Sequence, residues 1–284
     1  MKVNQKNIEN FRKNGIFIAK GAAVVDFKDR IIDDLLSIIK STIKYSNTDN
    51  KTKLLYEDFF KYSEDLQKSE QLSKCIDFVI ENENDHEYSS ALYEIFYNSP
   101  EVISSINNKF INDTLVSLGV KHPLASDLPL VRIDRANYRV FDTPWHQDYW
   151  QSYLSHNAIV AWFSLTHLFP SIGLLEVIPR SHKEGCLNFK KFEKGAAPFT
   201  LADNISTKSP MSIKLKYDEI LFFNSYLIHR SGLNNSKTTR ITMQMRYNDL
   251  TTLKKQVSPY VIKYSDYVES FHKSQLNLSK KPEV

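Results

Sequence analysis

The chain has 284 residues, of which 42% are hydrophobic and 25% charged, an ordinary composition for a globular protein large enough to bury a full core. Its 37 basic and 33 acidic residues give a net charge of +4, and the basic residues are scattered, which argues against nucleic-acid binding and a membrane-surface role. The sequence has no apolar run long enough to span a membrane, no signal-peptide pattern and no C-x-x-C among its 2 cysteines, so we expect a reduced, cytoplasmic protein.

Helical patterns dominate the first part of the chain. Asp26 is expected to cap a helix whose apolar residues follow at helical spacing. These apolar residues are Phe27, Ile31, Leu35, Ile38 and Ile39. Residues 54–98 have a mixed, mostly helical pattern with a polar break near 81–85. Ser99-Pro100-Glu101 predicts the start of a further helix that runs to Gly119, because serine caps helices, proline fits their first turn and glycine favours their end.

Short strand patterns separated by turns begin at Leu130. The strands are expected at 130–140, 157–168, 172–178, 211–215, 219–224 and 239–248. Helices followed by this series of strands indicate a mainly β fold with flanking helices, whose core is a double-stranded β-helix, the cupin-like jelly roll. We expect a single domain over 1–284, with a helical front at about 1–125, the jelly-roll core at about 129–262 and a frayed tail at about 273–284.

Two histidines and an aspartate form the most informative pattern of the chain. His146 and Asp148 belong to a His-Gln-Asp motif, and His229 follows a buried-strand pattern at 220–223. Two imidazoles and a carboxylate can hold ferrous iron on one face and leave the opposite face open for other ligands. A second motif of this type, at 182–184, lies in a polar stretch, so the first is the better candidate metal site.

An arginine completes this pattern. Arg240 follows His229 closely and opens an alternating segment that predicts a strand. A guanidinium grips a carboxylate through two parallel hydrogen bonds, which is what the site needs if a dicarboxylate chelates the open face of the iron. These residues predict an oxygenase that uses iron(II), 2-oxoglutarate and O2.

The same residues resemble the phytanoyl-CoA dioxygenase family of iron(II)/2-oxoglutarate oxygenases, and the resemblance extends, with gaps, from about residue 8 to about residue 248. The matching segments occur in the family's order. They are Phe11 to Ile18, Trp145 to Asp148, Gly173 to Gly185, and His229 to Ser231 with Asn235 and Arg240. One departure is Arg180, which stands where the family usually has glycine and puts the local turn geometry in question.

The resemblance implies roles for the site residues. His146, Asp148 and His229 would bind the iron as metal ligands and catalytic centre. Arg240 and Ser231 would hold the far carboxylate of 2-oxoglutarate. Trp162 matches a tryptophan of the family that either contacts the co-substrate or packs in the core.

The substrate is predicted less sharply. Alternation along the strand before His146 would place Arg135 and Arg139 on one face, where they could bind an anionic substrate, and Arg132 on the other. The turn at 142–144 leaves open that the two faces are reversed, and exposed arginines are the default. Two aromatic residues, Tyr149 and Trp150, could line the substrate pocket. Residues 185–209 predict either a substrate lid or a surface connection, and the lid is slightly favoured.

The expected reaction is hydroxylation of an unactivated C–H bond of a small, possibly anionic or sugar-like metabolite, with release of succinate and CO2. Because Asp148 fills the carboxylate position, hydroxylation is favoured over halogenation. The same iron centre could instead carry out desaturation, epimerisation or ring formation, and a non-catalytic binding protein on the same barrel is a remote alternative. We expect neither nucleic-acid nor membrane partners, and the sequence makes no prediction of oligomeric state.

Overall fold

The computed structural model describes residues 3–45, 49–82, 87–126, 129–136, 143–152, 155–192, 199–202 and 209–252. The helices are α1 (Gln5–Asn14), α2 (Ala22–Tyr45), α3 (Asn50–Ser63), α4 (Lys68–Glu81), α5 (Glu87–Asn98), α6 (Pro100–Ser104), α7 (Lys109–Ser117) and α8 (Tyr149–Ser152). The strands are β1 (Ile16–Lys20), β2 (Pro123–Ala125), β3 (Leu130–Asp134), β4 (Ile159–Ser164), β5 (Leu175–Val177), β6 (Phe189–Lys191), β7 (Phe199–Leu201), β8 (Met211–Ile213), β9 (Glu219–Asn224), β10 (His229–Ser231) and β11 (Arg240–Asp249). None of the helices in these ranges is long and apolar enough to cross a membrane.

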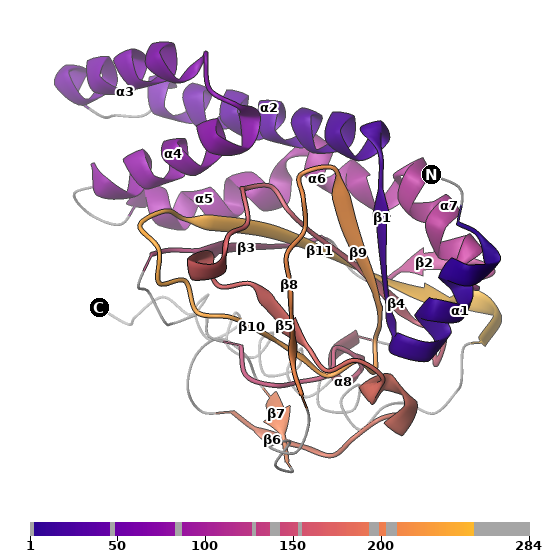
Figure 1. The fold of residues 1–284 in the computed structure, drawn as a ribbon. Coiled ribbons are helices and arrows are strands. Elements are labelled where there is room, and N and C mark those ends of the chain that lie inside the picture. The colour runs from indigo at the N-terminus through magenta and orange to yellow at the C-terminus, as the bar shows by residue number, and fades with distance from the viewer. Residues whose placement is uncertain are drawn as a thin grey trace, which may run out of the picture.

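A large antiparallel sheet forms the centre of the molecule, with helices along one of its faces (Figure 1). Its strands run in the order β1-β9-β4-β11, and both β2 and β3 pair with the far edge of β11. In this register Thr242 of β11 lies between Ser164 of β4 and Arg132 of β3. The long strand β11 therefore pairs with β4 along one edge and with β2 and β3 along the other.

The pleat of β11 divides its side chains between two environments. Ile241, Met243, Met245 and Tyr247 are buried in the core under the helices, which also contains the apolar faces of α2 and α4. The residues between them point to the opposite face of the sheet, because side chains alternate along a strand. This opposite face carries Arg240, Thr242, Gln244, Arg246 and Asn248.

A second, smaller antiparallel sheet, β10-β5-β8, covers that face of the large sheet, and β6 and β7 form a separate hairpin. A second core fills the space between the sheets, where Trp162 and Phe223 of the large sheet meet Leu175 and Val177 of the small one. Two facing antiparallel sheets with outer helices make up the predicted jelly roll with flanking helices, so the fold-class prediction is confirmed.

The helix predicted to begin at Asp26 begins earlier, at Ala22. Asp26 lies inside α2, where it pairs with Arg30 one turn later at 2.6 Å, so its predicted role as cap is wrong. The extended glycine Gly21 ends β1, and the following Ala22-Ala23 favours helix, so α2 needs no side-chain cap at Asp26. The predicted apolar stripe is correct in outline, because Phe27, Ile31, Leu35 and Ile39 are all buried.

The helix predicted from Ser99 to Gly119 is broken in two. Ser99 caps α6 by accepting a hydrogen bond from the amide of Val102, but the helix ends at Ser104. Asn108 then accepts from the amide of Ile111 and starts α7, because asparagine competes with the helix backbone and favours caps. Upstream, the mixed segment 54–98 contains three helices, α3 to α5, with the expected break after Glu81.

Two strands lie in the front that was predicted to be helical. β1 pairs with β9 and β2 with β11, so this part of the chain completes the large sheet. The strand predicted over 130–140 ends at Asp134 in the described residues. The stretch 185–209 is less irregular than predicted, because it contributes β6 and β7. The tail at 273–284 lies outside the described residues.

Arg180 has a left-handed backbone, with φ of 72°. This region is disfavoured for residues with a Cβ and is readily adopted by glycine, the residue usual at this position in the resembled family. Arg180 thus adopts a backbone suited to glycine, at a cost of about 1–2 kcal/mol.

A buried lysine joins α2 to the large sheet. The Nζ atom of Lys28 donates hydrogen bonds to the carbonyls of Tyr217 (2.9 Å) and Glu219 (3.0 Å) and lies 5.3 Å from the ring centroid of Phe163. Lys28 is 1% exposed, and burial lowers the pKa of its ammonium group from 10.5 to about 7.

This burial makes stability depend on pH. The folded-state pKa of Lys28 lies below the unfolded-state value, so the unfolded chain binds more protons between these values and the free energy of unfolding rises with pH from about 7 to about 10.5. Its slope should approach about 1.4 kcal/mol per pH unit and be absent in Lys28→Met. Chemical denaturation between pH 7 and 9 measures this slope. Burial raises the pKa of Cys75 to about 12, so Cys75 contributes a slope of the opposite sign above this range. If the free energy of unfolding changed with pH in the same way in the wild type and in Lys28→Met, the expected release of a proton by Lys28 on folding would be contradicted.

Candidate active site

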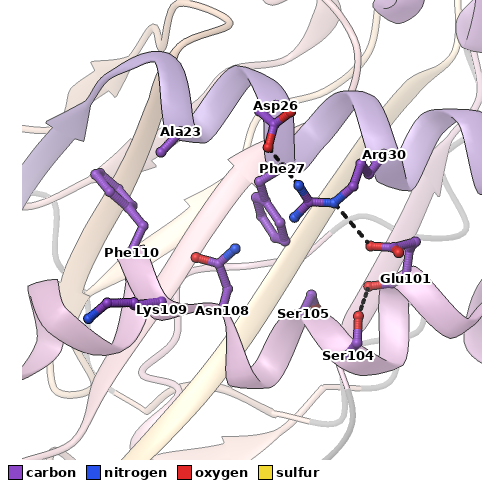
Figure 2. A pocket seen from close by; sticks show the side chains of 10 residues that line it. All are labelled: Ala23, Asp26, Phe27, Arg30, Glu101, Ser104, Ser105, Asn108, Lys109 and Phe110. Atoms are coloured by element: carbon purple, nitrogen blue, oxygen red, sulfur yellow. Dashed lines mark hydrogen bonds and ion pairs between the residues drawn. The ribbon is translucent and has the colours of Figure 1, made fainter.

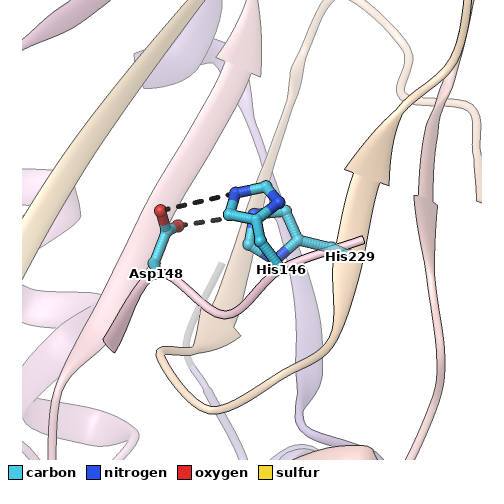
Figure 3. A group of neighbouring side chains, drawn as sticks. All are labelled: His146, Asp148 and His229. Carbon is cyan, nitrogen blue, oxygen red and sulfur yellow. Dashed lines mark ion pairs between the residues drawn. The ribbon is translucent and has the colours of Figure 1, made fainter. Parts of the chain in front are cut away.

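The residues of the candidate metal site come from two neighbouring segments. His146 and His229 pair as an isolated antiparallel bridge, each amide donating to the other carbonyl at 3.0 Å, and Asp148 precedes α8. This pairing brings the three side chains together (Figure 3). Nε2 of His146 is 3.9 Å from Oδ1 of Asp148, and Nε2 of His229 is 3.5 Å from Oδ2. One potential ligand atom from each residue lies within 4.8 Å of the other two.

Both imidazoles are held in the form that a metal requires. Nδ1 of His146 lies 2.8 Å from the carbonyl of Pro144, and Nδ1 of His229 lies 3.0 Å from the carbonyl of Leu227. Each Nδ1–H therefore donates to backbone, which leaves the lone pair on Nε2 directed at the shared space. Burial, together with the neighbouring His229, lowers the pKa of His146 to about 3, and burial also lowers the pKa of His229. Two neutral imidazoles and a carboxylate suit a ferrous ion.

The carboxylate of Asp148 is fixed by two residues of β11. Gln244 donates from Nε2 to Oδ2 at 2.6 Å, and Arg246 donates from Nη2 to Oδ1 at 3.0 Å. Burial alone would raise the pKa of Asp148, but the Arg246 guanidinium and the two imidazoles outweigh it and hold this pKa below its usual range. Asp148 is thus an anion with a set orientation.

The residue between His146 and Asp148 anchors their loop. Gln147 is fully buried and its amide donates to the carbonyls of Gly185 (2.9 Å) and Tyr226 (2.6 Å). Its Oε1 accepts from the amide of Leu187 at 2.9 Å. His146 and Asp148 therefore project from a segment that is tied to two other loops.

A separate group of polar contacts links β3, β10 and the first residue of β11. Arg240 donates from Nε and Nη2 to Oδ2 of Asp134, at 3.1 and 2.8 Å. Arg132 donates from Nη2 to the other oxygen, Oδ1, at 2.7 Å. Its Nη1 donates to the hydroxyls of Ser231 (2.7 Å) and Thr143 (2.6 Å). Burial would raise the pKa of Asp134, but the two guanidiniums hold it below its usual range.

The sequence left two arrangements of Arg132 open. One placed it on the face opposite to Arg135 and Arg139 and away from the site, and the reversed arrangement placed it toward the site; its contact with Ser231 is what the reversed arrangement expects. β3 ends at Asp134, so Arg135 lies beyond the strand within which parity holds. Arg135 is half-buried, and Arg139 lies outside the described residues.

The aromatic residues proposed for the pocket have different surroundings. Trp162 is buried on the inner face of β4, opposite Gln244. Tyr149 is half-buried, with its ring centroid 4.2 Å from that of Tyr226. Trp150 is 1% exposed, and its indole donates to the carbonyl of Leu187 at 3.0 Å within a separate apolar cluster. This burial gives Trp150 a packing role, and its place in the pocket lining stays a prediction.

Sequence reasoning missed three residues that contact the site, namely Asp134, Gln244 and Arg246. The signal for the last two was present: they lie an even number of residues from Arg240 on a predicted strand and so share its face. The second histidine motif is separate from the site. The ring of His182 donates to the carbonyl of Arg12 at 3.1 Å and leaves no room for a Cβ at Gly15.

Comparison with known proteins agrees with this geometry. The model of the phytanoyl-CoA dioxygenase (PhyH) family matches residues 26–242, most of the chain. The chain belongs to the phytanoyl-CoA dioxygenase family. It is therefore a 2-oxoglutarate-dependent non-heme iron oxygenase, whose cofactors are iron(II), 2-oxoglutarate and O2. No curated protein sequence matches the chain.

Three solved structures are similar to this chain over most of their length. The carbocyclase SnoK of nogalamycin biosynthesis is 12% identical, with 87% of this chain and 85% of that chain covered and a TM-score of 0.50. The epimerase SnoN, in complex with Fe3+, α-ketoglutarate and nogalamycin RO, is 13% identical, with coverage of 89% and 87% and a TM-score of 0.50. EctD from S. alaskensis is 15% identical, with coverage of 91% and 80% and a TM-score of 0.50. These likenesses show that this member of the phytanoyl-CoA dioxygenase family shares the fold of SnoK, SnoN and EctD.

A cavity of about 330 Å³ on the helical side is distinct from this site. It lies between α2 and the segment from α6 to α7 (Figure 2). Phe27 lines it and also packs on Phe163, which faces the helices, so the large sheet separates this cavity from the histidines. Three of its charged residues pair with one another, since Arg30 contacts both Asp26 and Glu101, and the fourth, Lys109, pairs with Asp113.

Proposed function

We propose that His146, Asp148 and His229 hold the iron(II) of this enzyme. The observation that carries the proposal is the convergence of three buried donor atoms within 4.8 Å, with both imidazoles fixed through Nδ1. When bound, iron with 2-oxoglutarate and O2 supplies the oxidant that removes hydrogen from a substrate C–H bond. The contribution of the chain is to orient the ligands and to keep water out.

Arg240 and Ser231 are proposed to bind the far carboxylate of 2-oxoglutarate. Asp134 occupies the edge of the Arg240 guanidinium formed by Nε and Nη2. The end formed by Nη1 and Nη2 is a second edge that can donate two parallel hydrogen bonds to a carboxylate. Asp134 would then hold the guanidinium in place while the second edge binds the co-substrate.

Apolar side chains around the metal site support a dry reaction space. Trp162, Phe223 and Leu175 form part of the core between the two sheets, and the ring centroid of Phe223 lies 4.8 Å from that of His229. Exclusion of water strengthens the electrostatic contacts to the co-substrate and protects reactive species from side reactions. A contact between Trp162 and the co-substrate remains part of this proposal.

The outcome we propose is hydroxylation of a small-molecule substrate, since Asp148 supplies a carboxylate ligand and no position is vacated for a halide. Ring formation or epimerisation is the second candidate, supported by the fold shared with SnoK, described as a carbocyclase, and SnoN, described as an epimerase. The SnoN complex with nogalamycin RO is consistent with a small-molecule substrate for this chain as well. An anionic or sugar-like substrate stays part of this proposal, with the half-buried Arg135, directly after β3, as its proposed contact.

The proposed metal ligands lead to a prediction about metal binding. Anaerobic protein should bind about one Fe(II) per chain, and 2-oxoglutarate should then produce the weak visible band of a chelated ferrous centre. The His146→Ala/His229→Ala variant should lose both metal and band, as measured by metal analysis and absorption spectroscopy. Retention of both would remove this assignment of the ligands.

Gln244 provides a finer test of the same centre. Gln244→Leu should weaken metal binding about 10- to 100-fold, because the hydrogen bond that orients Asp148 is lost. Thr242→Val is the matched control and should leave metal binding unchanged. Thr242 lies on the same inner face of β11, whereas the described contacts to Asp148 come from Gln244 and Arg246.

The prediction for the co-substrate is that Arg240→Ala leaves iron bound and weakens 2-oxoglutarate. Loss of one partner of a buried, charge-assisted pair typically costs about 2–5 kcal/mol, or roughly 30-fold to several thousand-fold in affinity. Titration of the visible band measures this affinity. An unchanged value would mean that Arg240 serves only its structural pair with Asp134.

The reaction outcome has its own readout. Metabolite pools should be screened for substrate-stimulated release of succinate, and the product's mass then identifies the reaction. Hydroxylation adds one oxygen atom, ring formation or desaturation removes two hydrogen atoms, and epimerisation leaves the mass unchanged. A product without added oxygen would replace hydroxylation by the second candidate.

A further inference from the structure

The β6–β7 hairpin belongs to a segment that binds the loop of two proposed metal ligands. The two partners are residues 145–150, the ligand loop, and residues 185–191 with 199–201, the hairpin segment. At the start of the hairpin segment, the side-chain amide of Gln147 donates to the carbonyl of Gly185 at 2.9 Å. Its Oε1 accepts from the amide of Leu187, also at 2.9 Å. Gln147 is fully buried, so water does not readily replace these bonds.

The other end of the hairpin segment binds the residue before His146. The amide of Leu201 donates to the carbonyl of Trp145 at 3.0 Å, and the hydroxyl of Thr200 donates to the same carbonyl at 3.2 Å. On the opposite edge, His146 exchanges two backbone hydrogen bonds with His229. Successive residues of an extended chain direct their backbone groups to opposite edges. The ligand loop is therefore held between β10 on one side and β7 on the other.

Apolar packing strengthens the same contact. Trp150 of the ligand loop and Leu201 of β7 are 1% and 6% exposed and belong to one apolar cluster with Ile228. The indole of Trp150 also donates to the carbonyl of Leu187 at 3.0 Å, and its ring centroid lies 5.2 Å from that of Phe189. This cluster is separate from the core between the two sheets. It therefore attaches the hairpin segment to the ligand loop.

A shift of the ligand loop would move two metal ligands at once. His146 and Asp148 lie on either side of Gln147, whereas His229 belongs to β10. The three donor atoms lie within 4.8 Å of one another while the loop keeps its position beside β10. Ligands that surrounding contacts already hold in place need not be ordered when the ion binds, which raises metal affinity. The hairpin segment thus contacts the loop where its position matters for the metal.

We propose that Gln147 is a positioning residue that couples docking of the hairpin segment to metal binding. The docked hairpin segment holds His146 and Asp148 in the metal-binding arrangement, and undocking weakens the site. This inference rests on the proposed function. Coupling of this kind is reciprocal, so bound metal must favour docking by the same factor by which docking raises metal affinity. Contacts that orient metal ligands typically contribute about 10- to 100-fold to affinity, which sets the expected factor.

Hydrogen exchange measures the coupling without turnover. The full chain is compared with and without saturating Ni(II), a redox-stable divalent ion that suits imidazole ligands. In the wild type, the metal should slow exchange of the Leu201 amide and its neighbours in β6 and β7 about 10- to 100-fold. Gln147→Met keeps a similar volume without the hydrogen bonds and should weaken Ni(II) by the same factor. With this variant saturated, the slowing should fall to within about threefold.

Further variants separate positioning from general loss of stability. Gln147→Asn keeps the amide on a shorter side chain and should recover part of the affinity. Leu201→Ala loosens the hairpin segment from its own side and should also weaken Ni(II), which tests the inference if Gln147→Met fails to fold. Leu36→Ala is the matched control. It removes a leucine of similar exposure, 8% against 6% for Leu201, from the core under the helices and should leave Ni(II) affinity unchanged.

The outcomes separate the inference from the proposed function. If Ni(II) binds to the wild type but leaves exchange in β6 and β7 unchanged, the coupling is overturned and Gln147 only supports the ligand loop. Unchanged Ni(II) affinity in both Gln147→Met and Leu201→Ala would overturn it as well. A wild type that binds neither Ni(II) nor Fe(II) would instead remove the proposed function itself.

Discussion

The pleat of β11 is the constraint on which the site depends. Alternate residues of this strand face the space between the sheets, which brings Arg240, Gln244 and Arg246 into one row. Gln244 and Arg246 contact the carboxylate of Asp148, while Arg240 marks the proposed co-substrate end. Arg240 and Gln244 are four residues apart, so the strand separates the two ends by about 13 Å. A single rigid element thus sets the distance between them.

Placing these residues between two sheets requires compensation of buried charge. Asp148 has Arg246 as its partner, and Asp134 has Arg132 and Arg240. Such pairs contribute little net stability, because desolvation offsets much of their attraction, but removal of one partner leaves a costly unpaired charge. The network therefore fixes orientations more than it stabilises the fold. The apolar core under the helices contributes the burial that stabilises the molecule.

Much of this arrangement could be predicted from residue patterns. The strand signals at 219–224 and 239–248 correspond closely to β9 and β11, and the predicted group of His146, Asp148 and His229 does converge in space. The pairing of His146 with His229 could not be predicted, because it depends on long-range contacts that local periodicity does not contain.

The errors have local physical causes. The face of Arg132 could not be fixed from the sequence, because parity holds only within a strand and β3 ends at Asp134, before the metal motif. The long helix after Ser99 was predicted as continuous because its apolar spacing persists across the break at Asn108, whose side chain caps a new helix instead. β1 was missed because its five residues follow a helix closely and their pairing partner, β9, lies about two hundred residues later in the chain.

The position of β1 at the edge of the large sheet also bears on where the chain can be shortened. The segment matched by the family model begins at residue 26 and ends at residue 242, whereas β1 precedes it and β11 continues beyond it. A protein trimmed to those limits would leave β9 with a bare row of backbone donors and acceptors, a template for pairing with other molecules. It would also lack Gln244 and Arg246, so the region that the family model recognises leaves out two residues that orient the carboxylate of Asp148.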